Sequence, residues 1–229
     1  MPNELGAVVR ELSLERVDGD NVHAGTVGGV EVVASGTGIG TERATQAATR
    51  MLDATTATDH VMVVGIAGGV GDTQVGDVVL PAVVVDGVDS REFRPSRLSG
   101  QPLKGKLSTS DEFHRTPEQL AQMVGDGVVA VDMETAAIAR VCEERGRPWS
   151  AVRAISDPVG AYSDDTVLKL AHPDGSPNVP AALRYMLFHP WRIPALVRLG
   201  RDASRACRLA AATAADQIRI AANGQRSRS

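Results

Sequence analysis

Residues 128–157 read VVAVDMETAAIARVCEERGRPWSAVRAISD, and this stretch alternates between the sequence patterns of strands and helices. The valines of Val128–Val131 predict a strand, and good helix formers follow from Glu134 to Glu144 until a glycine and a proline end the helix. The apolar run from Trp149 to Ile155 predicts a second strand. A strand, a helix and a strand in this order favour a parallel sheet with a helix against one face.

The same alternation extends towards the N-terminus. Strands are expected over Val27–Ser35, Val61–Ile66 and Asp77–Val85, and a helix over Thr41–Leu52. Pro81 marks an edge or a bend in the last of these strands, and a loop or short hairpin follows up to Lys106. The sequence therefore predicts a three-layer α/β/α fold with a mostly parallel, mixed central sheet, built as one domain over residues 1–222.

The composition predicts a soluble protein with an ordinary core. Of the 229 residues, 43% are hydrophobic and 23% are charged, and the net charge of -4 gives no overall attraction to nucleic acid. Neither the two cysteines, Cys142 and Cys207, nor the five histidines have metal-ligand spacing. The N-terminus has no signal-peptide pattern, and no apolar run approaches the roughly 20 residues of a membrane span. We expect a cytoplasmic protein with no metal or other cofactor.

Four segments with useful chemistry follow predicted strands. Two are glycine turns, Gly36–Gly40 and Gly65–Gly69, and two carry carboxylates, Asp132–Glu134 and Ser156–Asp157. Because ligands of open α/β sheets bind at the carboxyl ends of strands, all four are expected at one rim. Taken alone, the glycines fit tight strand-to-helix turns equally well. A dinucleotide site does not fit, since Thr41 stands where G-x-G-x-x-G needs its third glycine.

Three motifs carry a resemblance to a known family. They are Val131-Asp132-Met133-Glu134-Thr135-Ala136-Ala137, then Arg153-Ala154-Ile155-Ser156-Asp157, and Gly65-Ile66-Ala67-Gly68-Gly69 followed by Val75-Gly76-Asp77-Val78-Val79. From about Glu4 to Asp157 the chain resembles the nucleoside phosphorylase and methylthioadenosine/S-adenosylhomocysteine nucleosidase superfamily. Pro173–Gly175 and the Arg-rich end look closest to its hopanoid-associated phosphorylase-like branch. The resemblance implies a nucleoside phosphorylase-like fold and a homo-oligomer.

The resemblance also implies cleavage of the bond between a purine base and ribose. This reaction leaves an electron-rich base, and an acid that protonates its N7 helps it to depart. The resemblance gives that role to Asp157, whose ordinary pKa of about 3.9 must then be raised by a partly desolvated site; spacing alone favours a helix N-cap. Glu134 offers two oxygens to adjacent ribose hydroxyls, and Met133 offers an apolar surface to the sugar or to the core.

Further site residues are assigned by the resemblance alone. The base would be bound by Phe113, His114 and Ser156, although core packing is an equal alternative for Phe113. The nucleophile or a phosphate would lie at Gly38, Ile66, Ala67 and Gly68, and Glu4 would position or activate the nucleophile.

Two departures from the family pattern bear on the nucleophile. Family members carry a hydrophobic strand before this glutamate, whereas Glu4 follows none, and a glutamate so near a terminus is expected to be solvated. Ile66 stands where many relatives carry Ser or Thr, and only Arg43 of the helix after the first glycine turn could reach a bound phosphate. Water is therefore the favoured nucleophile.

The expected function is a purine nucleosidase that acts on an adenosine-type, 5′-substituted nucleoside. Two alternatives remain open. One is a phosphate-dependent purine nucleoside phosphorylase, and the other is a catalytically impaired nucleoside-binding protein.

The end of the chain is basic, with nine arginines against two aspartates over residues 184–229. At 100° per residue one helix face holds Arg198, Arg201, Arg205 and Arg208, and roughly opposite lie Leu199, Ala203, Ala210 and Ala214. Residues 184–222 are expected to be helical and residues 223–229 disordered. Two interpretations remain open: a helix packed on the domain with its arginines in water, or weak peripheral contact with an anionic membrane.

Overall fold

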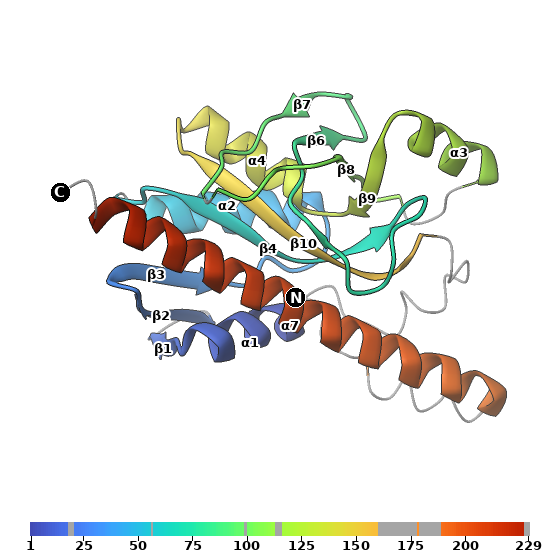
Figure 1. The fold of residues 1–229 in the computed structure, drawn as a ribbon, viewed down its shortest axis with the longest axis horizontal. Helices are drawn as coiled ribbons and strands as arrows, with labels where there is room; N and C mark the ends of the chain where they lie inside the picture. The colour runs from blue at the N-terminus through green and yellow to red at the C-terminus, as the bar shows by residue number, and fades with distance from the viewer. Residues whose placement is uncertain are drawn as a thin grey trace.

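The computed structural model describes residues 1–17, 21–55, 57–98, 100–112, 116–159, 178 and 189–226. Within these residues a seven-stranded sheet carries helices on both faces, and a three-stranded sheet lies beside the N-terminal helix (Figure 1). The expected three-layer α/β/α fold with a mixed sheet is confirmed.

The large sheet has the strand order β5-β10-β4-β9-β8-β6-β7. Its strands are β4 (Val61–Gly69), β5 (Val78–Val79), β6 (Val83–Asp86), β7 (Glu92–Phe93), β8 (Lys106–Thr109), β9 (Val128–Asp132) and β10 (Trp149–Pro158). The pairings β10–β4, β8–β9 and β6–β8 are parallel, and β10–β5, β4–β9 and β6–β7 are antiparallel. The longest pairing, between β4 and β10, is parallel, and it joins two strands that were each predicted from a buried apolar run.

The described helices are α1 (Pro2–Leu12), α2 (Thr41–Ala54), α3 (Pro117–Gly125), α4 (Thr135–Glu144), the 3-10 turn η1 (Pro190–Arg192) and α7 (Ile193–Arg226). Alternate residues of β4 face the helices on the two sides of the sheet. Val63 and Ala67 share a core with α2 and α4, whereas Met62, Val64 and Ile66 pack towards α7, which crosses the opposite face (Figure 1). The strand period of two places successive side chains in different layers.

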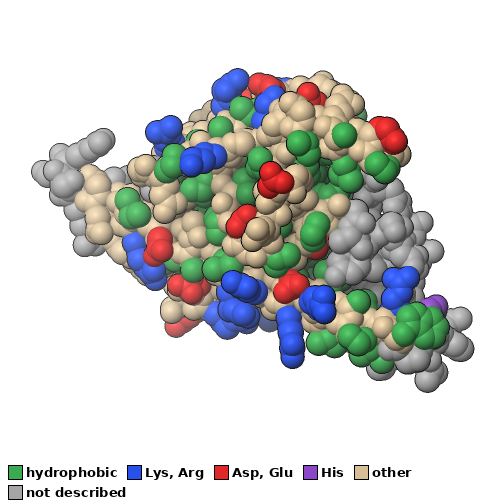
Figure 2. All heavy atoms as spheres, turned by 45° about the vertical axis from the view of Figure 1, so that its right-hand side comes forward, with side chains coloured by type: hydrophobic (Ala, Val, Ile, Leu, Met, Phe, Trp, Pro, Cys, Tyr) green, Lys and Arg blue, Asp and Glu red, His purple; other side chains and the backbone are tan. Residues whose placement is uncertain are grey.

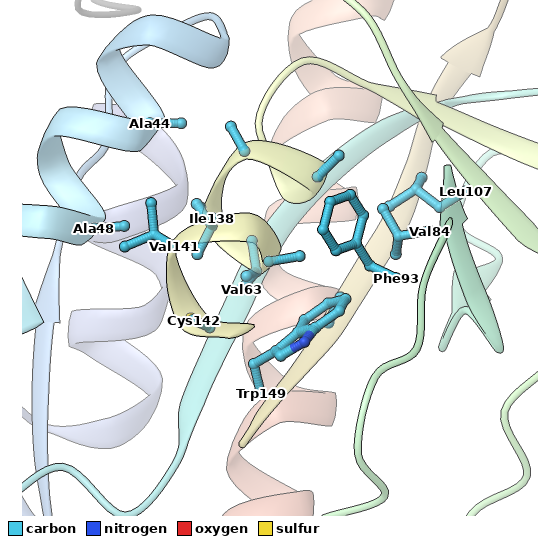
Figure 3. Packing of buried hydrophobic residues seen from close by; sticks show 14 of the residues in the cluster. Ala44, Ala48, Val63, Val84, Phe93, Leu107, Ile138, Val141, Cys142 and Trp149 are labelled. Atoms are coloured by element: carbon cyan, nitrogen blue, oxygen red, sulfur yellow. The ribbon is translucent and has the colours of Figure 1, made fainter. Parts of the chain in front are cut away.

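The core beside α4 is built mainly from small aliphatic side chains. Figure 3 shows Phe93 near Val84 and Leu107 at one side of the cluster, with the Trp149 ring below it and Ala44 and Ala48 at the opposite side. Phe93 is fully buried, and α2 contributes Ala44 and Ala48 one helical turn apart. With few aromatic residues in the chain, close helix-to-sheet packing through alanine and valine supplies most of the buried apolar surface.

The predicted single strand over Val27–Ser35 is wrong. This segment belongs to a hairpin of β2 (Val22–Val27) and β3 (Val30–Ser35), which joins β1 (Glu15–Val17) in the small sheet. Gly28 and Gly29 have φ angles of 61° and 90°, and two adjacent glycines with positive φ make a two-residue hairpin turn favourable.

Other element boundaries differ from the predicted ones by smaller amounts. The strand expected over Asp77–Val85 is interrupted around Pro81, giving β5 at the sheet edge and then β6, which forms a hairpin with β7. Helix α7 continues to Arg226, so residues 223–226, which were expected to belong to a disordered tail, are helical. Pro173–Gly175 and the first residues of the expected basic helical segment, 184–188, lie outside the described residues. Within the described chain no helix is both long and apolar enough to cross a membrane.

Candidate active site

Three carboxylates surround the guanidinium of Arg153, which projects from the middle of β10. Its Nη2 lies 2.5 Å from Asp132 Oδ2 and 3.6 Å from Glu134 Oε2, and its Nη1 lies 3.8 Å from Glu4 Oε1. The Arg153 side chain is only 3% exposed. Burial alone would lower the pKa of Arg153, but the three carboxylates raise it, so the arginine stays charged.

Asp132 and Thr135 hold this arginine in place. Thr135 Oγ1 accepts hydrogen bonds from Arg153 Nε at 3.1 Å and Nη2 at 2.9 Å, and it donates its own proton to Asp132 Oδ2. Asp132 Oδ1 accepts from Thr109 Oγ1 at 2.6 Å and from the Thr135 backbone N–H at 3.3 Å. Every buried polar group here is therefore satisfied. Neither Asp132 nor Arg153 has a role that the sequence motifs assign, although an arginine inside the apolar run of β10 signals buried carboxylate partners.

Glu4 lies in this site, and the expectation that it is solvated is wrong. Its Oε1 accepts a hydrogen bond from the Ile66 N–H at 2.9 Å, and its Oε2 lies 2.6 Å from the N-terminal ammonium. The cause is packing of α1: Ala7 is buried against Cys207 and Ala211 of α7, which lays the first turn of α1 over the end of β4.

Gly65 leaves the room that this arrangement needs. A Cβ on Gly65 would stand 2.3 Å from both Arg153 Nη1 and Glu4 Oε1, a separation that non-bonded atoms do not tolerate. Gly65 pairs with Arg153 in the β4–β10 register, so the glycine lies directly beside the arginine. The second glycine turn therefore has a steric role that spacing alone did not identify.

Glu134 stands at the N-cap of α4 and joins the first glycine turn to the site. Its Oε1 accepts a hydrogen bond from the Gly40 N–H at 3.2 Å, and Gly38 and Gly40 both have positive φ angles. Burial raises the pKa of Glu134 to about 7; Arg153 acts in the opposite direction, and Asp132 and Glu4 add to the rise. The expected meeting of the two glycine turns and the Asp132–Glu134 segment is confirmed by these contacts.

Asp157 lies near the end of β10, opposite Gly68 of β4. Ser156 is buried, and its Oγ lies 2.5 Å from Asp157 Oδ1 and 3.4 Å from the carbonyl of Ala67. Burial raises the pKa of Asp157, and the Ser156 hydroxyl partly opposes the rise. The carboxylate of Glu4 meets β4 at Ile66, two residues before Gly68, which corresponds to roughly 7 Å along the strand.

The remaining predicted residues lie at the margin of this cluster or outside the described part of the chain. Met133 is half-buried between Asp132 and Glu134, and Arg43 is exposed on α2. Phe113 and His114 lie outside the described residues. Asp111 accepts hydrogen bonds from the Thr41 N–H at 3.0 Å and from the Thr41 hydroxyl at 2.6 Å, which ties Asp111 to the first turn of α2.

Comparison with known proteins agrees with this architecture. Residues 1–104 and 96–174 match the family model described as the Phosphorylase superfamily. A 5′-methylthioadenosine/S-adenosylhomocysteine nucleosidase of Bacillus velezensis is 32% identical over 61% of this chain and 74% of its own length.

Solved structures show the same fold at lower identity. A Helicobacter pylori MTAN mutant with 5′-methylthioadenosine in the active site superposes with a TM-score of 0.70 at 17% identity, over 95% of this chain and 94% of that chain. The corresponding nucleosidase of Neisseria meningitidis in complex with methylthio-immucillin-A gives 0.68 at 22% identity, over 96% and 95%.

Proposed function

Because this chain belongs to the phosphorylase superfamily, we propose that it is a purine nucleosidase, an enzyme that hydrolyses the bond between base and ribose in an adenosine-type nucleoside. The relatives it matches are named as 5′-methylthioadenosine/S-adenosylhomocysteine nucleosidases. The observation that supports the proposal is the placement of three carboxylates in one site. Glu4 contacts Ile66 of β4, and Asp157 lies opposite Gly68 of the same strand. Glu134 faces Arg153.

Each carboxylate has an environment suited to one step. Asp157 is largely buried without a cationic partner among the described residues, so it holds a proton more readily than an ordinary aspartate and can give it to N7 of the departing base. Glu4 accepts the proton of a water that attacks C1′ of the ribose from the other end of the site. Glu134 has two oxygens to accept hydrogen bonds from adjacent ribose hydroxyls. The products are the free base and the free sugar, so the atoms of one water are accounted for.

The charge around Arg153 supports water over phosphate as the nucleophile. Asp132 already occupies its Nη2, and Glu4 and Glu134 both lie within 4 Å of the guanidinium. A dianionic phosphate beside these carboxylates would be repelled, and it needs several cationic or N–H donors. Arg43, the arginine that the sequence offered for a phosphate, is exposed on α2.

Base release measured by chromatography tests the proposal. The purified protein is offered methylthioadenosine, S-adenosylhomocysteine, adenosine and inosine, each with and without phosphate. We expect release of adenine from the adenosine-type substrates at the same rate in both conditions. A strict need for phosphate would establish the phosphorylase instead, and tight binding with no release would establish a nucleoside-binding protein.

We further propose a cytoplasmic homo-oligomer. Cys142 and Cys207 are both buried, unpaired thiols, as suits a reducing compartment. The oligomer rests on the family resemblance, and light scattering of the purified protein tests it.

A further inference from the structure

The beginning of α7 projects from the domain. From Ala206 onward the helix buries residues at most turns, among them Ala210 and Ala214, which pack against β4 and β10. In contrast, none of the residues from Ile193 to Arg205 is buried. Figure 1 shows this orange part of α7 extending past the end of the sheet. The apolar face that we expected opposite the arginines is thus partly used for packing, because Ala210 and Ala214 belong to the core.

Large apolar side chains remain exposed on the projecting part. Trp191 is 70% exposed, Val197 49% and Ile193 37%. Ile193 and Val197 are four residues apart and therefore share one helix face. Figure 2 shows hydrophobic side chains gathered at this end of the molecule, with Lys and Arg side chains beside them along the helix. Exposed apolar groups of this size grouped at one tip favour an apolar or interfacial partner.

A strip of arginines adjoins these apolar residues. Arg198, Arg201, Arg205 and Arg208 are all exposed, and the helical period places them on one side. Arg201 follows Val197 by four residues, so the charged strip borders the apolar one. From residue 190 to residue 208 the single acidic residue is Asp202. The partner must therefore combine negative charge with an apolar layer.

We propose that residues 191–208 are a docking surface for an anionic lipid bilayer. Trp191, Ile193 and Val197 enter the interface, where amphipathic aromatic side chains are favoured. The guanidinium groups of the arginine strip bind lipid phosphates, which they match in geometry. A second copy of this chain is disfavoured because the same strip would face its own charge, and a nucleic acid offers no layer for the apolar residues. The surface uses no residue of the candidate active site, so the proposal is independent of the proposed function.

Co-sedimentation of the full chain with vesicles tests this surface. We expect binding to phosphatidylcholine vesicles that contain phosphatidylserine, weaker binding at high salt, and none to phosphatidylcholine alone. The combined change Arg198→Gln, Arg201→Gln and Arg205→Gln should lower the affinity about a hundredfold. Ile193→Ser with Val197→Ser should lower it as well. The matched control is Arg219→Gln with Ile220→Ser near the other end of the same helix, where Ile220 is 47% exposed; it should bind as the unchanged protein does.

Tryptophan fluorescence gives a second readout. The chain has two tryptophans, and Trp149 is only 2% exposed, so a blue shift on addition of anionic vesicles reports Trp191. The shift should disappear in Trp191→Phe. Absence of sedimentation and of a shift in the unchanged protein would overturn the proposal. The proposal would also be overturned if the protein bound duplex DNA as tightly as anionic vesicles and the Ile193→Ser/Val197→Ser variant kept that DNA binding. Such a result would identify a general polyanion surface. Base release should be unchanged in all these variants.

Discussion

Arg153 Nη2 and Asp132 Oδ2 lie 2.5 Å apart in a pair whose side chains are 3% and 1% exposed. The pair joins the middle of β10 to the end of β9, and it holds the guanidinium with Nη1 3.8 Å from Glu4 Oε1 and Nη2 3.6 Å from Glu134 Oε2. The geometry of the candidate site therefore depends on a buried ion pair that itself has no place in the proposed chemistry.

Loss of this pair should cost much more stability than loss of a surface pair. Asp132→Asn leaves the arginine charge buried without its closest partner, and we expect a loss of about 3 kcal/mol in the free energy of unfolding. Arg145 and Asp53 form a pair of similar length, 2.6 Å, but Asp53 is 64% exposed. Asp53→Asn should cost under about 1 kcal/mol. Urea denaturation measures both, and equal losses would show that burial does not set the strength of the Arg153 pair.

Gly65→Ala should abolish base release. The added methyl group would overlap Arg153 Nη1 and Glu4 Oε1, so both side chains must move away from β4. The control is Gly200→Ala on α7, where an added Cβ meets nothing within 4 Å. Turnover of the control should match that of the unchanged protein. Full activity in Gly65→Ala would mean that Glu4 and Arg153 need not hold these positions.

Glu4→Gln should reduce turnover about a hundredfold to ten-thousandfold and leave ligand binding nearly unchanged, because an amide cannot take the proton of the attacking water. Glu11→Gln, an exposed change on the same helix, serves as control. Turnover is measured by adenine release, and binding by calorimetry with a non-hydrolysable analogue. A Glu4→Gln protein that turns over at the normal rate would remove Glu4 from the mechanism.

Asp157→Asn should show a similar loss of turnover, since an amide cannot protonate the base. The loss should be smallest for a nucleoside whose base departs without protonation. Asp72→Asn changes an exposed aspartate and should have no effect. Comparison of an activated and a natural substrate measures the difference, and equal losses on both would argue against an acid at this position.

Substrate binding should weaken as the pH falls through about 7. The folded-state pKa of Glu134 is about 7, so below this pH the carboxylate gains a proton and loses acceptor capacity for the ribose hydroxyls. KM for the riboside should rise there more than for the 2′-deoxyriboside, and Glu134→Gln should remove both the pH dependence and the preference. A pH-independent KM in the unchanged protein would contradict this role.

The same pKa fixes the sign of a stability effect. A carboxyl group whose pKa is raised on folding stabilises the folded state below its unfolded pKa, and that contribution is lost as the pH rises through 7. Glu134→Gln should therefore gain most in stability relative to the unchanged protein above pH 7. Urea denaturation at acidic and at alkaline pH checks the sign.

Local sequence patterns were sufficient for much of the fold. The alternation over residues 128–157 predicted β9, α4 and β10, and the apolar run Val61–Ile66 predicted β4. The error over Val27–Ser35 arose because two glycines within a valine-rich run are compatible both with a hairpin turn and with one continuous strand that the glycines weaken. Only the pairing of Val27 with Val30 distinguishes the two.

The sequence by itself determined the strand–helix–strand order over residues 128–157, the strand over Val61–Ile66, the two glycine turns and the carboxylates that follow the strands, since each depends on neighbouring residues. The tertiary structure alone decided which charges meet. Glu4 contacts Ile66 across 62 residues of chain, and Gly40 contacts Glu134 across 94. The contact of Glu4 exists because α1 packs on α7 and because Gly65 has no side chain, and neither cause can be read from the residues near Glu4. The energy of a charge depends on burial and partners brought together by packing, which is why Asp132 and Arg153 acquired a role only in the folded chain.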